Sequence, residues 1–223
     1  MKRPSILFLY ALTFGPIPGG LGAKDHQPEL PALKKEVSEV KAIVPGGWMI
    51  LAQASGDLNG DKKDDHVVIL SSSDTQNDDV NFQRILIVLL DEGGLLKVDA
   101  VSQKSVLSRF SGGIWGDPFE SLKIERGTFV ISHYAGSRNR WGFRHRYRFQ
   151  DGGYYLIGRT EYSHDTLSPE SEEKDENLIT GRVIETKVDE KGEKTRTDQK
   201  LKPRPLIPLG TGKFDEDGFL ELP

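Results

Sequence analysis

Short strand-like segments separated by glycine-rich turns are the feature that most limits what this chain can fold into. The turns carry pairs such as Gly93-Gly94, Arg126-Gly127 and Gly152-Gly153, which are strong hairpin signals. Between them the apolar residues alternate with polar ones or form short runs, as strands require. Eight strands are expected, over 48–54, 66–70, 84–90, 95–101, 121–126, 128–133, 141–149 and 154–161. The pattern therefore predicts an all-β protein and not a helical bundle.

The eight strands fall into two consecutive antiparallel four-stranded meanders. Such meanders pack either as a sandwich or as propeller-blade-like sheets. The run 85–90 is apolar at every position, which predicts a strand that is covered on both faces. Hydrophobic residues make up only 36% of the chain, so we expect a thin core with polar loops.

The flanks of this β domain, which we place at 46–162, have a different character. Residues 24–45 are expected to be a linker and one short helix over 32–44, with Leu33, Val37, Val40 and Val44 near helical spacing. Residues 163–223 are expected to form an acidic, serine-rich exposed loop over 165–177, then a polar hairpin of 178–188 and 193–201, and an extended C-terminal segment.

The N-terminus has the pattern of a signal peptide over 1–23. Lys2 and Arg3 precede the apolar run 6–14, which is too short to span a bilayer, and Gly22 and Ala23 offer a cleavage point. We therefore expect a periplasmic or secreted protein with no membrane span after cleavage. The absence of cysteine excludes disulfides and thiol chemistry. The net charge of −4 argues against nucleic acid as a partner.

Residues 57–65 place oxygen-bearing side chains at positions one, three, five and nine of a loop between two expected strands. These are Asp57, Asn59, Asp61 and Asp65, while position seven is Lys63, which offers only its backbone carbonyl. Calcium takes six to eight oxygen ligands, and tight loops supply them from alternating positions. The carboxylates would repel one another without a cation, so the spacing predicts a structural calcium site. The alternative is an acidic, hydrated turn without metal, since Asp, Asn and Gly are common turn formers.

The stretch 56–61, followed by Asp65 and the apolar run 67–70, resembles the calcium loops of FG-GAP repeats and of bacterial VCBS-type repeats. The resemblance implies that Asp57, Asn59, Asp61, the Lys63 carbonyl and Asp65 are the calcium ligands and that the metal makes the hairpin rigid. It covers a single copy, whereas a propeller needs several. An EF-hand would have Glu at position twelve, where this chain has Val68.

Lys62 departs from the pattern of these families, which have glycine directly after the third ligand. The loop needs a positive φ at that position. A non-glycine residue there costs roughly 1 kcal/mol. We therefore expect Lys62 to be left-handed and the site to be weaker than a glycine-containing one.

The segment 138–149 separates aromatic from basic residues by strand periodicity. One face carries Trp141, Phe143, Tyr147 and Phe149, and the other carries Arg144, Arg146 and Arg148. One interpretation is an anion-binding face for an acidic polysaccharide, lipid head groups or nucleic acid. The other is that the aromatic residues are core and the arginines pair with neighbouring acidic strands.

The segments 113–119 and 133–141 resemble parts of uncharacterised exported bacterial proteins, a resemblance that implies fold context without a chemistry. No catalytic residue can be named: the five histidines lack metal-ligand spacing and there is no nucleophile motif. The sequence thus predicts a calcium-stabilised binding or interaction protein, with an envelope polymer or another exported protein as partner. The alternative is a hydrolase of cell-envelope or extracellular polymer, with acidic residues near Trp115 or Trp141.

Overall fold

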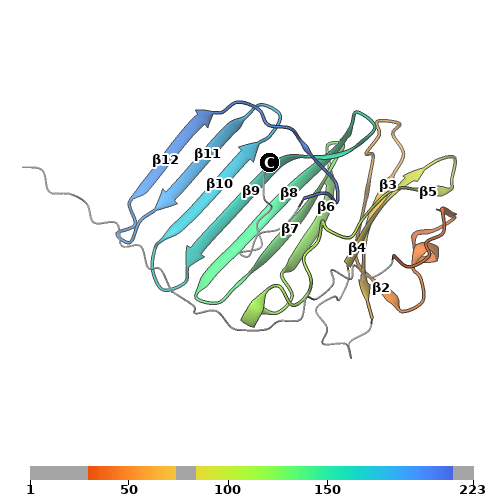
Figure 1. Cartoon of the computed structure of the whole chain (residues 1–223), viewed down its shortest axis with the longest axis horizontal. Coiled ribbons are helices and arrows are strands. Elements are labelled where there is room, and N and C mark those ends of the chain that lie inside the picture. The colour runs from red at the N-terminus through yellow and green to blue at the C-terminus, as the bar shows by residue number, and fades with distance from the viewer. Residues whose placement is uncertain (1–29, 74–83, 213–223) are drawn as a thin grey trace, which may run out of the picture. The chain divides into compact units, whose positions relative to one another are not determined.

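Two antiparallel sheets account for nearly all regular structure in the computed structural model, which describes residues 30–73 and 84–212 (Figure 1). The first sheet has the order β1-β5-β4-β3-β2, with β1 at Glu36–Val37, β2 at Trp48–Gly56, β3 at Asp65–Ser72, β4 at Arg84–Asp91 and β5 at Leu96–Ser102. The all-β class and the first expected meander are confirmed. The expected signal peptide lies outside the described residues, and no helix among the described residues is long and apolar enough to cross a membrane.

The second sheet runs in the order β12-β11-β10-β9-β8-β7-β6, and β13 pairs with β9. Its strands are β6 at Phe119–Glu125, β7 at Thr128–Gly136, β8 at Asn139–Gln150, β9 at Gly153–Asp165, β10 at Ser171–Asn177, β11 at Arg182–Val188, β12 at Lys194–Lys200 and β13 at Ile207–Pro208. The turns Arg126-Gly127 and Asp151-Gly152 have positive φ at both residues. That geometry matches the strand twist and closes two-residue hairpins.

The main core lies between the two sheets. Alternate residues of β3 and β4, such as Val67 and Leu86, pack in one cluster with Phe129 of β7 and with Tyr147 and Leu156 of β8 and β9. The sheets therefore pack as a sandwich, with β2 in contact with β6. We call the face of the second sheet that carries these residues the inner face and the opposite face, with Ser132, Arg144 and Thr160, the outer face.

A second core cluster covers the other face of the five-stranded sheet. Ile85, Ile87 and Leu89 of β4 pack there against Val37 and Ile43 from the N-terminal segment. Every residue from Ile85 to Leu89 has no exposed surface, so the expectation of a doubly covered strand is confirmed. The helix expected over 32–44 is instead β1 followed by the 3-10 helix η1 at Val40–Ile43. The pairing of β1 with β5 uses backbone groups that a longer helix would have kept for itself.

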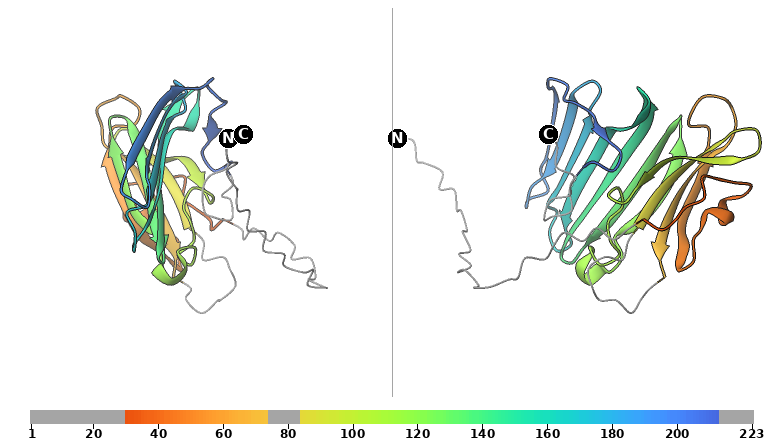
Figure 2. Two further views of the ribbon diagram at one scale, coloured as in Figure 1. Left: turned by 90° about the vertical axis from the view of Figure 1, so that its left-hand side faces the viewer. Right: turned by 45° about the vertical axis from the view of Figure 1, so that its right-hand side comes forward.

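The prediction of an exposed loop over 165–177 is wrong for its second half, because β10 pairs with β9 along one edge and with β11 along the other. Its charges are matched across the strands: Glu172 lies 2.8 Å from Lys187, and Glu176 lies 2.9 Å from Arg159. The expected polar hairpin is confirmed as β11 and β12. The second sheet thus continues past the predicted boundary at 162, and Figure 2 shows β10 to β12 extending it in line with β6 to β9.

The ion pair between Arg159 and Glu176 gives a test of this extension. Glu176 is buried and Arg159 nearly so, and Arg159 also contacts Glu161 at 2.7 Å. Glu176→Ala removes one of the two carboxylates that contact Arg159 and leaves Glu161 as its partner, so the free energy of unfolding should fall by roughly 1–3 kcal/mol. Urea unfolding measures this change.

Glu172→Ala is the matched control, since it removes the same side chain from the same strand and the same face, but from an exposed pair with Lys187. It should change stability little, because exposed ion pairs contribute little. Equal effects of the two substitutions would contradict the assignment of Glu176 as a structural anchor of β10.

Candidate functional site

The acidic loop of residues 57–65 joins β2 to β3, as the sequence predicts. Leu58, inside the loop, is buried in the main core, while most of the other loop residues are exposed. The loop is therefore fixed to the core at its second residue and at Asp65, where β3 begins. Its middle projects into solvent, where an ion could approach.

The side-chain oxygens of the loop turn back onto its own backbone. The Asp57 carboxylate accepts hydrogen bonds from the Gly60 N–H at 2.6 Å and the Lys62 N–H at 2.9 Å. Asn59 and Asp61 each accept from the N–H two residues ahead, both at 2.9 Å. The backbone N–H groups that donate to Asp57, led by that of Gly60, lower the pKa of its carboxyl. These bonds turn the oxygen-bearing side chains at positions one, three and five toward the backbone of the loop.

Lys62 has a φ of 67°, so the expected left-handed residue after the third ligand position is confirmed. A side chain there is strained by roughly 1 kcal/mol relative to glycine. The loop adopts this conformation nonetheless, because the Lys62 N–H donates to Asp57.

Asp65 has a different role from the other loop oxygens, because it has no exposed surface. Its Oδ2 accepts a hydrogen bond from the Leu58 N–H at 2.9 Å, and its Oδ1 accepts one from the Asp91 N–H at 3.0 Å. One buried carboxylate thus joins the loop, the start of β3 and the end of β4. Hydrogen bonds from two backbone N–H groups stabilise a carboxylate in a buried position and fix its orientation.

The donor set of the loop fits a hard cation in its chemistry. It offers carboxylate, amide and carbonyl oxygens, and each carboxylate oxygen keeps a second lone pair beside the N–H that it accepts. The Lys63 ammonium lies 4.0 Å from Asp61 and 3.9 Å from Asp91, which puts a positive charge next to the loop. Across the described ranges no three His, Cys, Asp or Glu side chains are gathered as a metal-holding group.

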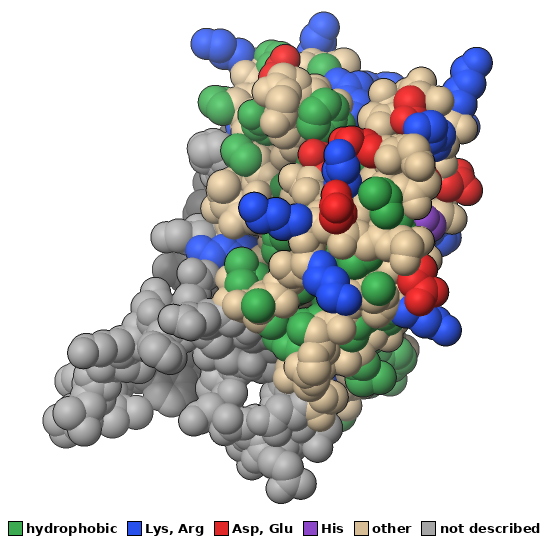
Figure 3. Space-filling view, turned by 90° about the vertical axis from the view of Figure 1, so that its right-hand side faces the viewer, with side chains coloured by type: hydrophobic (Ala, Val, Ile, Leu, Met, Phe, Trp, Pro, Cys, Tyr) green, Lys and Arg blue, Asp and Glu red, His purple; other side chains and the backbone are tan. Residues whose placement is uncertain are grey.

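The aromatic and basic residues of β8 lie on opposite faces, as expected. Phe143 and Tyr147 are buried on the inner face, Trp141 is half-buried and Phe149 is 40% exposed. Arg144, Arg146 and Arg148 lie on the outer face. By contrast, basic and acidic side chains are interspersed on the side of the molecule that Figure 3 shows.

The three outer-face arginines differ in their partners. Arg146 lies 2.5 Å from Glu125 and donates to Thr128 at 2.8 Å, and this contact lowers the pKa of Glu125. Arg148 donates to Gln150 at 2.6 Å. Arg144 is exposed, and no carboxylate of the described part of the chain forms an ion pair with it. The interpretation as paired arginines therefore holds for Arg146 and not for Arg144.

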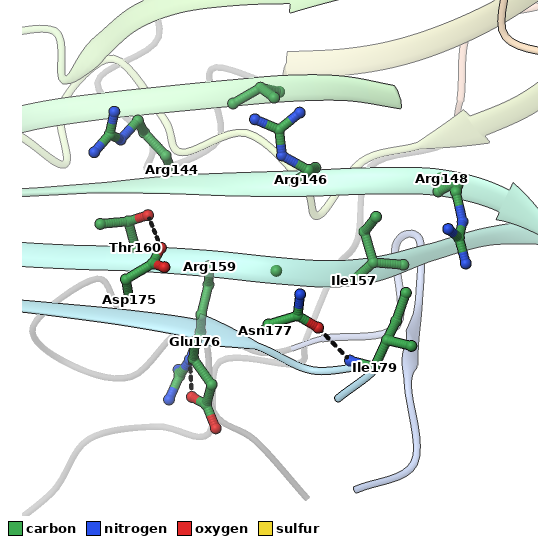
Figure 4. A pocket seen from close by; sticks show the side chains of 12 residues that line it. Arg144, Arg146, Arg148, Ile157, Arg159, Thr160, Asp175, Glu176, Asn177 and Ile179 are labelled. Atoms are coloured by element: carbon green, nitrogen blue, oxygen red, sulfur yellow. Dashed lines mark hydrogen bonds and ion pairs between the residues drawn. The ribbon is translucent and has the colours of Figure 1, made fainter. Parts of the chain in front are cut away.

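A hollow of about 480 Å³ lies on the outer face along these arginines (Figure 4). Its other walls come from β9 and β10. Thr160 donates to Asp175 at 2.8 Å, and the Asn177 amide oxygen accepts the Ile179 N–H at 3.1 Å. The hollow is thus lined by cations on β8 and by neutral or hydrogen-bonded polar groups opposite them. This arrangement can bind an anion without first breaking an ion pair at Arg144.

The acid–histidine pairs that a hydrolase would use are held in structural contacts. Asp117 forms an ion pair with the buried Arg84, and the Nε2 of His133 accepts the Leu107 N–H at 3.2 Å. A second hollow, also of about 480 Å³, has His164 beside three carboxylates. Asp165 there lies 2.7 Å from Arg138, and Glu172 lies 2.8 Å from Lys187.

Two buried histidines on the inner face were not singled out by the sequence analysis. His133 and His145 have no exposed surface and flank Phe143, with ring centroids 4.6 Å and 4.5 Å from it. Burial lowers the pKa of His133 to about 3 and that of His145 well below its usual range, and nearby positive charge adds to both shifts. Both are neutral in the folded protein. In β8, His145 stands two residues from both Phe143 and Tyr147, and in β7 His133 is paired with Phe143. The alternation of residues along the strands could therefore have predicted that both histidines lie on the inner face.

These histidines predict a loss of stability as the pH falls from 7 to 5. The unfolded chain takes up protons near pH 6.5, whereas folded His133 stays neutral to about pH 3. Unfolding therefore binds protons, and each histidine lowers the free energy of unfolding by up to about 1.4 kcal/mol per pH unit below 6.5. Urea unfolding at pH 7, 6 and 5 measures the slope.

His145→Leu should make this slope shallower, since one of the two groups no longer titrates. Phe143→Leu is the control, because it changes the same part of the core without removing a titratable group. It should lower stability at every pH and leave the slope as it is. An unchanged slope in His145→Leu would show that the pH dependence has another origin.

Comparison of the chain with family models, with curated proteins and with solved structures found no match.

Proposed function

We propose that this chain is an exported, calcium-stabilised binding protein whose outer face takes an anionic ligand. The observation that carries the proposal is Arg144, an exposed cation without a carboxylate partner among the described residues, on the rim of the 480 Å³ hollow. A guanidinium presents a planar set of donors that suits carboxylate, sulfate or phosphate. Arg148, which donates to the neutral Gln150 and forms no ion pair within residues 30–73 and 84–212, adds a second positive charge.

Calcium is proposed for the acidic loop because its oxygen-bearing side chains stand at alternating positions and turn toward the backbone of the loop. Asp57, Asn59, Asp61, the Lys63 carbonyl and Asp65 would hold the ion, which would offset the repulsion among their carboxylates. Because Asp65 also binds the Leu58 and Asp91 backbone, calcium would stabilise the β2–β3 hairpin and the end of β4 together. The role is structural, and the anion-binding face lies on the other sheet.

Export is the third part of the proposal and rests on the N-terminal sequence, which lies outside the described residues. Extracytoplasmic calcium reaches millimolar concentration, so a weak loop with Lys62 at its sixth position would still be occupied there. The net acidity of the chain and the arginines of the outer face fit a partner of moderate negative charge. An envelope polymer or another exported protein has that character.

Calcium at 5 mM should raise the melting temperature by roughly 3 °C, and a chelator should reverse the rise. This size follows from a dissociation constant near the weak end for such loops and from the usual dependence of melting temperature on stability. Asp57→Ala should abolish the response. Thermal unfolding followed by circular dichroism makes the measurement, with magnesium as the comparison ion.

Asp189→Ala is the matched control for Asp57→Ala. The Asp189 carboxylate also accepts two backbone N–H groups in a turn, from Lys191 and Glu193 at 2.9 Å each. It is not part of the acidic loop. The Asp189→Ala variant should therefore keep the calcium response. If calcium does not raise the melting temperature of the parent protein, the proposed calcium site is excluded.

The outer face should retain the protein on a sulfopropyl resin at low salt, and retention should fall as salt screens the charges. Arg144→Ala should elute at distinctly lower salt than the parent protein, because it removes the cation that needs no ion pair to be broken. Lys41→Ala, which removes the same charge from an exposed position in η1, should elute close to the parent. Equal shifts for the two variants would mean that net charge alone governs retention.

A further inference from the structure

Four rings gather at one end of the outer face, and we call them the aromatic platform: Trp115, Tyr134, Tyr162 and His164. Trp115 belongs to the 3-10 helix η2 at Gly113–Trp115, and its ring meets Tyr134 edge-on at 5.4 Å. The Tyr134 ring lies nearly parallel to Tyr162 and to His164, at 6.1 Å and 6.3 Å. The four residues come from three separate segments, so the strand periodicity of any one of them does not predict the platform.

Gly142 leaves room for the side chain of Tyr162 to reach across from β9 onto β8. A Cβ at Gly142 would stand 2.3 Å from the ring and hydroxyl of Tyr162, so the ring covers the strand where the glycine leaves room. The hydroxyl end of the Tyr162 ring therefore lies over Gly142 of β8. Burial raises the pKa of Tyr162 to about 12, so its phenol keeps its proton and can donate a hydrogen bond.

Cations border the platform on two sides. Arg140 donates to the Gly136 carbonyl at 2.7 Å and places its guanidinium 4.0 Å from the centre of the Trp115 ring. No carboxylate pairs with Arg140 in the ranges that the structure describes. On the other side, Arg144 follows Gly142 by two residues, which puts it about 6.6 Å further along β8. The platform thus joins the arginine-lined hollow without a break in the strand.

The charge density of the outer face is moderate. Registers from β6 to β10 place five basic and three acidic side chains on it: Lys123, Arg140, Arg144, Arg146, Arg148, Glu125, Glu173 and Asp175. Glu120, at the irregularity of β6, adds a fourth carboxylate close to Tyr162. A strand of nucleic acid, with a phosphate at every nucleotide, would bring its phosphates against these carboxylates. A polymer with fewer charges and with apolar faces between them suits this surface better.

We propose that the aromatic platform and Arg144 together bind an anionic polysaccharide, a glycan that carries sulfate or carboxylate groups. Sugar rings present C–H groups on their faces, and these pack against the electron-rich faces of aromatic rings. The acidic groups meet Arg140 and Arg144, and the phenol of Tyr162 donates to a hydroxyl or ring oxygen. This inference rests on the proposed anion-binding function and names the chemical class of its ligand.

The test compares four polymers by isothermal titration with the full chain at constant salt: dextran sulfate, neutral dextran, polyphosphate and a single-stranded oligonucleotide. Dextran sulfate should bind at least tenfold more tightly than polyphosphate or the oligonucleotide, and neutral dextran should not bind. Trp115→Ala should weaken dextran sulfate binding at least fivefold and leave polyphosphate binding unchanged. Arg144→Ala should weaken both.

Ile114→Ala is the matched control, because Ile114 is the neighbour of Trp115 on the same helix and is 92% exposed. It should bind as the parent does. Tyr162→Phe keeps the ring and loses the donor, so it should weaken dextran sulfate binding less than Trp115→Ala does. The melting temperature of each variant is measured as well, and only variants that melt at the temperature of the parent protein are compared. This separates loss of the binding site from loss of the fold.

The outcomes distinguish the inference from the proposed function. If polyphosphate or the oligonucleotide binds as tightly as dextran sulfate, or Trp115→Ala changes nothing, the glycan inference is overturned while anion binding stands. If no polymer binds, or Arg144→Ala has no effect on any of them, the anion-binding function fails and the glycan inference fails with it.

Discussion

The burial of β4 between two apolar layers is the constraint on which the rest of the structure depends. Ile85, Ile87 and Leu89 face the N-terminal segment, and Leu86 and Val88 face the second sheet. A strand with no exposed apolar residue needs both covers, since either face left in water would lose its share of the hydrophobic stabilisation. The N-terminal segment and the inner face of the second sheet are therefore both fixed by one short run of sequence.

This buried strand also decides where the acidic loop can sit. Asp65 begins β3 beside the end of β4, and its carboxylate binds the Asp91 N–H on one side and the Leu58 N–H on the other. With Leu58 in the main core, the loop is held at both ends by groups that cannot move without disturbing the sandwich. A cation bound in the exposed middle of the loop would add contacts to a backbone that Leu58 and Asp65 already hold in place. The loop therefore suits a structural ion better than one that switches the conformation.

The sequence allowed the eight central strands to be predicted because their turns carry glycine where the backbone needs positive φ. It did not allow β10 to be predicted, since its residues look like a solvated acidic run. Its partners Arg159 and Lys187 lie on two neighbouring strands, and only the register shows that each acid meets a base. For the same reason the alternation in β8 placed the arginines on one face, but could not tell that Glu125 and Gln150 engage Arg146 and Arg148.

β10 also forms part of the candidate site. β10 supplies Asp175 and Asn177, which form the wall of the hollow opposite the arginines. Asp175 is hydrogen-bonded to Thr160 and so lies across from Arg144 without pairing with it. β10 thus forms the wall of the hollow that faces the arginines of β8. The end of β8 that carries Arg140 is also where the rings of Trp115 and Tyr162 lie, so a cation and an aromatic surface meet there.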